Sequence, residues 1–165
     1  MGGSKCDQLS NGLYVPNGTS STVTWFNAGY YLNSLKFTVP NDGTVTIGLE
    51  KTEVLPDDYE VVGAWHLYYY GDEDEPTVTD YTSVIVNPTF DPAKGDKSTG
   101  VIEGWTTSAM NGYKENTVSY NRAGITLYQT LNGLPAGEYE VTVHTYYRAG
   151  YADADFALWQ EDPDL

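Results

Sequence analysis

Two stretches of alternating apolar and polar residues, separated by a turn, constrain the fold of this chain more than any other feature. Leu35, Phe37 and Val39 alternate with polar residues, Pro40-Asn41-Asp42-Gly43 follows, and the alternation resumes over residues 45–49. A period of two residues places every apolar side chain on one face of a strand, whereas an amphipathic helix needs a period of about 3.6. The sequence therefore predicts a β-hairpin with one buried face.

The same pattern recurs later in the chain. Residues 125–131 and 139–145 alternate on either side of Asn132-Gly133-Leu134-Pro135-Ala136-Gly137, which predicts a second hairpin. The other expected elements are a strand over 61–70 with Trp65, Leu67 and Tyr69 on one face, short strands over 83–86 and 156–159, and one or two helical turns within 20–32. Because no sustained helical pattern follows any strand, the sequence predicts an all-β protein, a jelly-roll β-sandwich, with Trp65 and Trp105 in its core.

Charge composition excludes several classes of partner. The 165 residues, a length typical of one domain, include 8 Lys plus Arg against 23 Asp plus Glu, so the formal net charge is -15. Such a surface repels phosphate backbones and anionic lipid headgroups, which argues against nucleic-acid and membrane-surface binding. No apolar run approaches the roughly 18 residues of a membrane-spanning helix, and the single cysteine, Cys6, excludes an internal disulfide.

Several motifs of the second half resemble a known family. Residues 82–90 (TSVIVNPTF) followed by Gly104-Trp105 resemble the opening of carbohydrate-binding-like, or galactose-binding-like, jelly-roll modules in surface and secreted proteins of glycan-degrading bacteria. The match continues through Tyr120-Asn121, residues 127–131, 134–139 and 146–150. The first half resembles the end of the same module over residues 14–17, 26–31, 43–48 and 67–71, although Ala64-Trp65-His66 replaces the family's frequent Asp-Asn-Phe.

The order of the two halves is inverted relative to the family. Residues 1–71 resemble the C-terminal half of a module, 72–80 form an acidic linker, and 81–165 resemble the N-terminal half. The two halves are expected to form one sandwich, either as a circularly permuted unit or as two half-modules of a tandem array with flanking modules. A domain-swapped homodimer is the alternative to a monomer. The resemblance implies a bacterial protein outside the cell or on its surface.

The resemblance implies non-catalytic binding of carbohydrate. Sugars offer apolar C–H faces to aromatic rings and hydroxyls to polar side chains. The predicted ring platforms are Trp25, Tyr146, Tyr151 and Trp159, and the predicted polar anchors are Asn17, Asn121 and Arg148. For Arg148 a structural salt bridge is the competing role, and for the asparagines a turn. The net negative charge favours neutral oligo- or polysaccharides over acidic glycans.

Two other functions compete with carbohydrate binding. A structural or adhesive spacer would keep the fold without a sugar site. A small glycoside hydrolase would need two carboxylates about 5–9 Å apart, and the candidates are Glu50, Glu103, Glu115, Glu138 and Glu140. We predict no catalysis and no cofactor, while a structural calcium ion would find carboxylates at Asp57-Asp58, Asp153-x-Asp155 or residues 72–75. His66 and His144 are expected to be ordinary strand residues.

Overall fold

The computed structural model describes residues 31–54, 58–71, 77–114 and 116–148. Two short 3-10 helices, η1 (Thr82–Val84) and η2 (Pro92–Lys94), are the only helical elements in these ranges. The strands are β1 (Leu32–Val39), β2 (Val45–Lys51), β3 (Tyr59–Tyr69), β4 (Thr79–Asp80), β5 (Gly95–Asp96), β6 (Val101–Ile102), β7 (Thr106–Thr107), β8 (Gly112–Lys114), β9 (Thr117–Asn121), β10 (Ile125–Leu131) and β11 (Gly137–Arg148).

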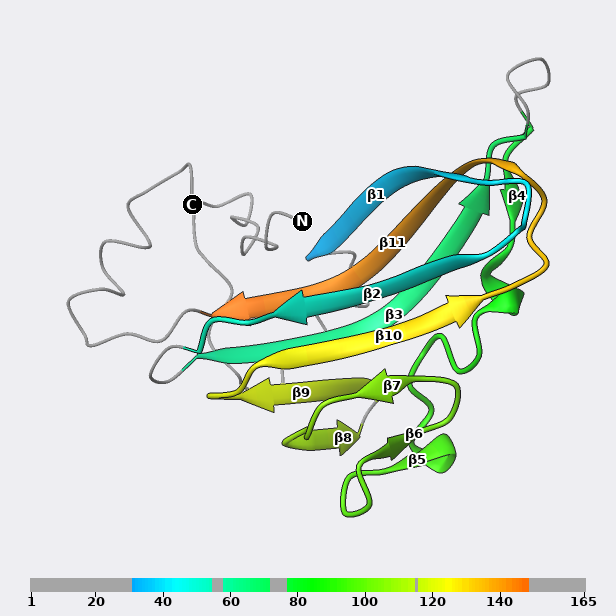
Figure 1. Cartoon of the computed structure of the whole chain (residues 1–165). Coiled ribbons are helices and arrows are strands. Elements are labelled where there is room, and N and C mark those ends of the chain that lie inside the picture. The colour runs from blue at the N-terminus through cyan, green and yellow to red at the C-terminus, as the bar shows by residue number, and fades with distance from the viewer. Residues whose placement is uncertain (1–30, 55–57, 72–76, 115, 149–165) are drawn as a thin grey trace, which may run out of the picture.

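The strands form two facing antiparallel sheets (Figure 1). The larger sheet has six strands in the order β1-β11-β3-β9-β8, with β4 paired to β3, and the smaller has three in the order β2-β10-β7. Strands β5 and β6 make a separate two-stranded ribbon. The predicted all-β sandwich is therefore confirmed.

Alternation along each strand builds the core between the sheets. In β10, burial alternates residue by residue, so Ile125, Leu127 and Leu131 face inward while Thr126, Tyr128 and Thr130 are exposed. The larger sheet contributes Trp65, Leu67, Val118, Tyr139, Val141 and Val143 to the same cluster. The predicted core positions of Trp65 and Trp105 are confirmed, since their side chains are 1% and 7% exposed. The predicted inward face of the strand over 61–70 is confirmed as well.

Both predicted hairpins are wrong in their pairing. Strand β1 pairs with β11, and β2 pairs with β10, so the turn at residues 40–43 carries the chain from one sheet to the other. The connection from β10 to β11 crosses in the same way. The turns themselves form as expected, since Gly43 N donates to Pro40 O at 2.9 Å. Alternation shows that two strands each bury one face, but a hairpin and a crossing between layers satisfy it equally.

The two crossings pack against each other at one end of the sandwich. Leu134 N donates to Gly43 O at 3.1 Å, and Thr44 Oγ1 donates to Asn132 Oδ1 at 3.3 Å. Gly43 has a φ of 68°, and a Cβ there would lie 2.6 Å from Leu134 O. Glycine is therefore required at this position both by the turn and by the close approach of the other crossing.

Both sheets of the sandwich contain strands from the two halves of the chain. In the described ranges, β1, β2 and β3 do not pair with one another; they pair with β4, β9, β10 and β11. The strands of residues 32–69 therefore obtain their backbone hydrogen bonds from the second half of the chain, whereas the second half also pairs β8 with β9, β7 with β10 and β5 with β6.

The Asn-Pro-x-Phe segment forms a buried corner in place of the strand predicted over 83–86. Helix η1 occupies residues 82–84, and Asn87 and Phe90 adopt positive φ values of 52° and 51°. The corner is held by Gln129, whose side chain accepts from Val86 N at 2.8 Å and donates to Val86 O at 3.1 Å. Trp105 Nε1 also donates to Val86 O, at 2.9 Å. These residues of the family-like motif thus have a packing role.

A β-bulge in β3 decides which side chains face the core. The register passes from Val143 opposite Trp65 to Thr145 opposite Val62, so Gly63 and Ala64 together stand opposite one residue of β11. An extra residue reverses the inside-to-outside alternation beyond it. Odd-numbered residues of β3 face inward after the bulge and outward before it.

Candidate functional site

The outer face of the larger sheet gathers aromatic and polar side chains from three strands. Tyr139, Val141 and Val143 of β11 lie in the core, so the even-numbered residues of this strand face outward. The register then places these side chains beside one another across β1, β11 and β3. We name this set the outer-face cluster: Ser34, Lys36, His66, Tyr68, Tyr70, Glu140, Thr142 and His144.

Three aromatic rings of this cluster follow one another along β3. His66 and Tyr68 lie with ring centroids 6.3 Å apart and nearly parallel, at 12°. Tyr70 comes next on the same side, where its hydroxyl donates to Glu140 Oε2 and Lys36 Nζ lies 4.4 Å from its ring centroid. All three rings are half-buried, so each keeps part of its surface open to solvent. The result is a strip of rings edged by a carboxylate and an ammonium group.

Hydrogen bonds keep the carboxylates beside the rings charged. The hydrogen bond from Tyr70 lowers the pKa of Glu140, with smaller contributions from Ser34 and Lys36. Hydrogen bonds from Thr82 lower the pKa of Asp80, which stands opposite Tyr68 on β4. Both groups are therefore acceptors at neutral pH.

The two histidines of the cluster lie close enough to influence each other. Burial lowers the pKa of His144, and the neighbouring His66 lowers it further. His144 is therefore neutral at pH 7 and offers one donor and one acceptor.

Three of the sequence-predicted site residues lie near one another in the strand pairing of the larger sheet. Arg148 and Asn121 stand opposite Tyr59 on its two sides, and Tyr146 stands opposite Val61 in the next row. Asn121 is exposed. Tyr146 is only 3% exposed and packs edge-on against Tyr31, with ring centroids 5.3 Å apart, which is the environment of a packing residue.

The remaining predicted site residues, Asn17, Trp25, Tyr151 and Trp159, lie outside the described residues. So do Asp57, Asp153, Asp155 and residues 72–75 of the proposed calcium sites, residues 20–30 of the helical stretch expected within 20–32, and the strand over 156–159. The end of the expected helical stretch is described, and there Leu32 begins strand β1 instead. The described ranges contain no group of three or more His, Cys, Asp or Glu side chains able to hold a metal ion. They also hold no helix with the length and hydropathy of a membrane span.

The sequence contained a signal for part of the outer-face cluster. Alternation along residues 61–70 places His66, Tyr68 and Tyr70 opposite the core-facing Trp65 and Leu67, although the sequence did not single out these rings as a site. Lys36 and Glu140 carry no comparable signal. They join the rings only because β11 lies between β1 and β3.

A second set of polar side chains lies between the two sheets, at the end of the sandwich where β3 begins. Lys51 Nζ of β2 forms an ion pair with Asp58 Oδ2 at 2.5 Å and lies 5.3 Å from the ring centroid of Tyr147. Thr107 of β7 and Tyr120 of β9 also join the two sheets, through hydroxyls 2.6 Å apart. We name this set the interior polar cluster: Lys51, Asp58, Glu60, Thr107, Tyr120 and Tyr147.

Glu60 is the buried carboxyl of the interior polar cluster. It is 8% exposed. In the larger sheet, Glu60 of β3 lies between its pairing partners Tyr120 of β9 and Tyr147 of β11. Burial raises the pKa of Glu60 from 4.5 to about 7, with Lys51 opposing the shift and Asp58 adding to it. The carboxyl group of Glu60, inside the sandwich, therefore still binds its proton at a pH close to neutral.

Glu60 is expected to make the protein less stable as the pH rises from about 4.5 to 7. In this window the unfolded chain has released the proton that the folded protein still binds, so the free energy of unfolding falls, by about 3 kcal/mol in total. Chemical denaturation of Glu60→Gln across this range should show a flatter pH profile and greater stability than the unsubstituted protein at pH 8. The exposed Glu138→Gln is the control, and an unchanged slope for Glu60→Gln would contradict the assignment.

Comparison with protein-family models, with curated proteins and with solved structures finds no match to this chain.

Proposed function

We propose that the protein binds neutral glycans on the outer face of its larger sheet. The observation that carries this proposal is the strip of half-buried rings, His66, Tyr68 and Tyr70, edged by Glu140 and Lys36. Aromatic faces receive the apolar C–H surface of a sugar ring, and charged or hydroxyl side chains beside them bind sugar hydroxyls. The site needs no catalytic group, and its role is recognition.

The charges of the site support a neutral rather than an acidic ligand. Glu140 and Asp80 are held in their charged form beside the rings, and the chain as a whole carries a net charge of -15. A uronic acid or a sulfated sugar would meet both local and long-range repulsion. A neutral hydroxyl can donate to either carboxylate.

We also propose that the sandwich is a jelly-roll module with its halves in permuted order, belonging to a secreted or surface protein of bacteria. Support comes from the presence of strands of residues 32–69 and of residues 79–148 in both sheets, where β1, β2 and β3 pair only with strands of the second segment in the described ranges. A permuted unit requires this mixing, because each half alone would leave an apolar face and free strand edges exposed.

Tyr68→Ala is expected to weaken glycan binding by about tenfold or more, because the central ring of the strip loses its stacking surface. Affinity electrophoresis and calorimetry with a panel of neutral polysaccharides would measure the change. Tyr128→Ala is the matched control, since Tyr128 is 39% exposed on the smaller sheet, outside the outer-face cluster.

Three results would count against the proposed site. Equal losses for Tyr68→Ala and Tyr128→Ala would place binding elsewhere. Absence of binding to every glycan of the panel would favour a structural spacer. Release of reducing sugar during the binding assay would favour a hydrolase instead.

A further inference from the structure

Two long strand edges face each other across one side of the sandwich. Strand β1 has 8 residues and β2 has 7, and in the part of the chain that the structure describes each pairs on one edge only, with β11 and β10 respectively. Both registers run without a shift. Each free edge therefore presents a regular row of backbone N–H and C=O groups.

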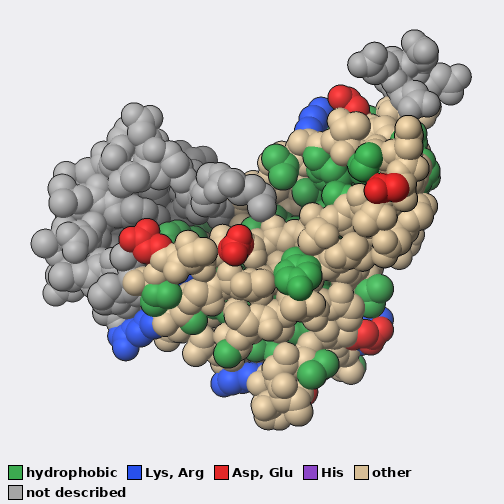
Figure 2. All heavy atoms as spheres, in the orientation of Figure 1, with side chains coloured by type: hydrophobic (Ala, Val, Ile, Leu, Met, Phe, Trp, Pro, Cys, Tyr) green, Lys and Arg blue, Asp and Glu red, His purple; other side chains and the backbone are tan. Residues whose placement is uncertain are grey.

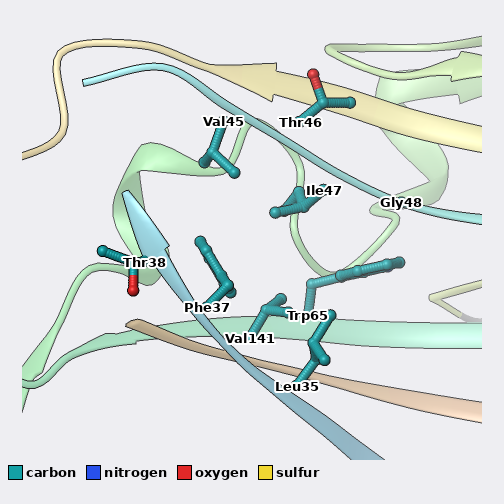
Figure 3. Close-up of a pocket in the computed structure, with 9 residues that line it drawn as sticks. All are labelled: Leu35, Phe37, Thr38, Val45, Thr46, Ile47, Gly48, Trp65 and Val141. Carbon is teal, nitrogen blue, oxygen red and sulfur yellow. The ribbon is translucent and has the colours of Figure 1, made fainter. Parts of the chain in front are cut away.

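An apolar groove of about 250 Å³ lies between these two edges. In Figure 3 the side chains of Leu35 and Phe37 from β1 and of Val45 and Ile47 from β2 point into the space between the strands, with Trp65 and Val141 at its base. Thr38 and Thr46 also line the groove, but their side chains lie on the other side of their strands from those of Phe37 and Val45. Figure 2 shows hydrophobic side chains gathered at the surface beside β1.

Most of the features that protect a free edge are missing from β1. It contains no proline and no bulge, and its single charged residue, Lys36, is on the outer face beside Glu140 rather than in the groove. Natural proteins block long regular edges with prolines, bulges, lysines or inward-pointing charges, because such edges accept additional strands, and Lys36 is the one such feature in β1. A long edge with so little protection, above an apolar groove, has the features of a strand-acceptor site.

We propose that β1 accepts an extended peptide strand from another polypeptide, with apolar side chains at alternate positions and basic residues at its ends. The backbone of that strand would pair with the free edge of β1, and its apolar side chains would fill the groove. A bound strand would use both the free edge and the apolar groove, whereas a compact apolar ligand would leave the backbone groups of the edge without partners.

The distribution of exposed apolar surface selects β1 over β2 as the acceptor. Leu35, whose side chain enters the groove from β1, is 44% exposed, whereas Ile47, whose side chain enters it from β2, is 4% exposed. An added strand therefore buries more apolar area on β1, in proportion to the surface removed from water. The net charge of -15 favours lysine or arginine at the ends of the incoming strand, where they remain in solvent.

The test uses a labelled, end-blocked peptide, Lys-Thr-Val-Thr-Val-Thr-Val-Thr-Lys, and a control peptide in which the central valine is proline. Fluorescence anisotropy with the full chain is expected to show binding of the first peptide and at least tenfold weaker binding of the second. Hydrogen exchange should show new protection of the backbone amides of residues 32–39. Leu35→Lys should reduce affinity at least tenfold, because it places a charge in the groove.

Thr38→Lys is the matched control, because it adds the same charge to β1 but on the opposite side of the strand from Phe37, so that the new side chain does not enter the groove. Its affinity for the peptide should stay within about twofold of the unsubstituted protein. Equal effects of the two lysine substitutions, or equal binding of the proline peptide, would overturn the proposal.

Occupation of the groove by the protein itself gives different results. Protection of the amides of residues 32–39 before any peptide is added would contradict an open acceptor edge. A change of oligomeric state on Leu35→Lys, measured by light scattering, would show that a second copy covers the groove and would likewise overturn the proposal. Neither result depends on glycan binding, which concerns the opposite face of the sheet.

Discussion

Replacing Trp65 with alanine is expected to lower the free energy of unfolding by about 3–5 kcal/mol, the range for removing a large buried aromatic side chain. The indole is 1% exposed and lies with its ring centroid 5.1 Å from that of Trp105, at the centre of the core. The backbone N–H of Trp65 also donates to Pro88 O at 2.9 Å, so its strand is tied to the buried corner. The large cost follows from the cavity that the substitution leaves between the two sheets.

Urea denaturation followed by circular dichroism would measure the effect of Trp65→Ala. Thr126→Ala is the control, because Thr126 is exposed on β10 and should change stability by no more than about 0.5 kcal/mol. Trp65→Phe should fall between the two, since it keeps an aromatic ring in the site. A loss below about 1 kcal/mol for Trp65→Ala would contradict the packing described for the core.

Lys51→Met is expected to destabilise the fold by about 3–5 kcal/mol, because it leaves a buried carboxylate without its cation. Asp58 is fully buried, with 0% of its side chain exposed, whereas 17% of Lys51 reaches solvent. The pair also joins β2 of the smaller sheet to the residue before β3 of the larger sheet. Loss of the ion pair therefore weakens the contact between the two sheets.

A double-mutant cycle separates the ion pair from the packing of the lysine stem. Lys51→Met combined with Asp58→Asn should be less destabilised than the sum of the two single variants, because the second change removes the negative charge that lost Lys51 in the first. Additive effects, measured by urea denaturation at one pH and ionic strength, would show that the pair contributes little.

The sequence predicted the faces of the strands better than their partners. Trp65 and Leu67 were placed in the core from alternation alone, and Gly43 was placed in a turn from the residues around it. Both assignments depend on neighbours within a few positions. The pairing of β1 with β11 joins residues 98 to 112 positions apart, and no local pattern distinguishes it from a hairpin with β2.

In the candidate site, too, the sequence predicted the face on which some residues lie but not which residues would be their neighbours. His66, Tyr68 and Tyr70 are placed on one face by their spacing along a single strand. Their neighbours Lys36 and Glu140 depend on the order of strands in the sheet, which alternation does not specify. Tyr146 was predicted as a platform from the glycine and charged residues near it, whereas the structure packs it against Tyr31, because strand β11 runs through Tyr146 to Arg148.

The sequence by itself determined that this chain folds from strands with one apolar face, because burial of alternating residues is decided locally by the two-residue period. It also determined the positions of the turns and the negative charge. The tertiary structure alone decided that the turns at residues 40–43 and 132–137 cross between layers and that both halves share both sheets. It also decided that β1, among the described residues, pairs on one edge only. Strand order is chosen by which apolar faces meet across the core and which edges pair, and these energies depend on the folded arrangement as a whole.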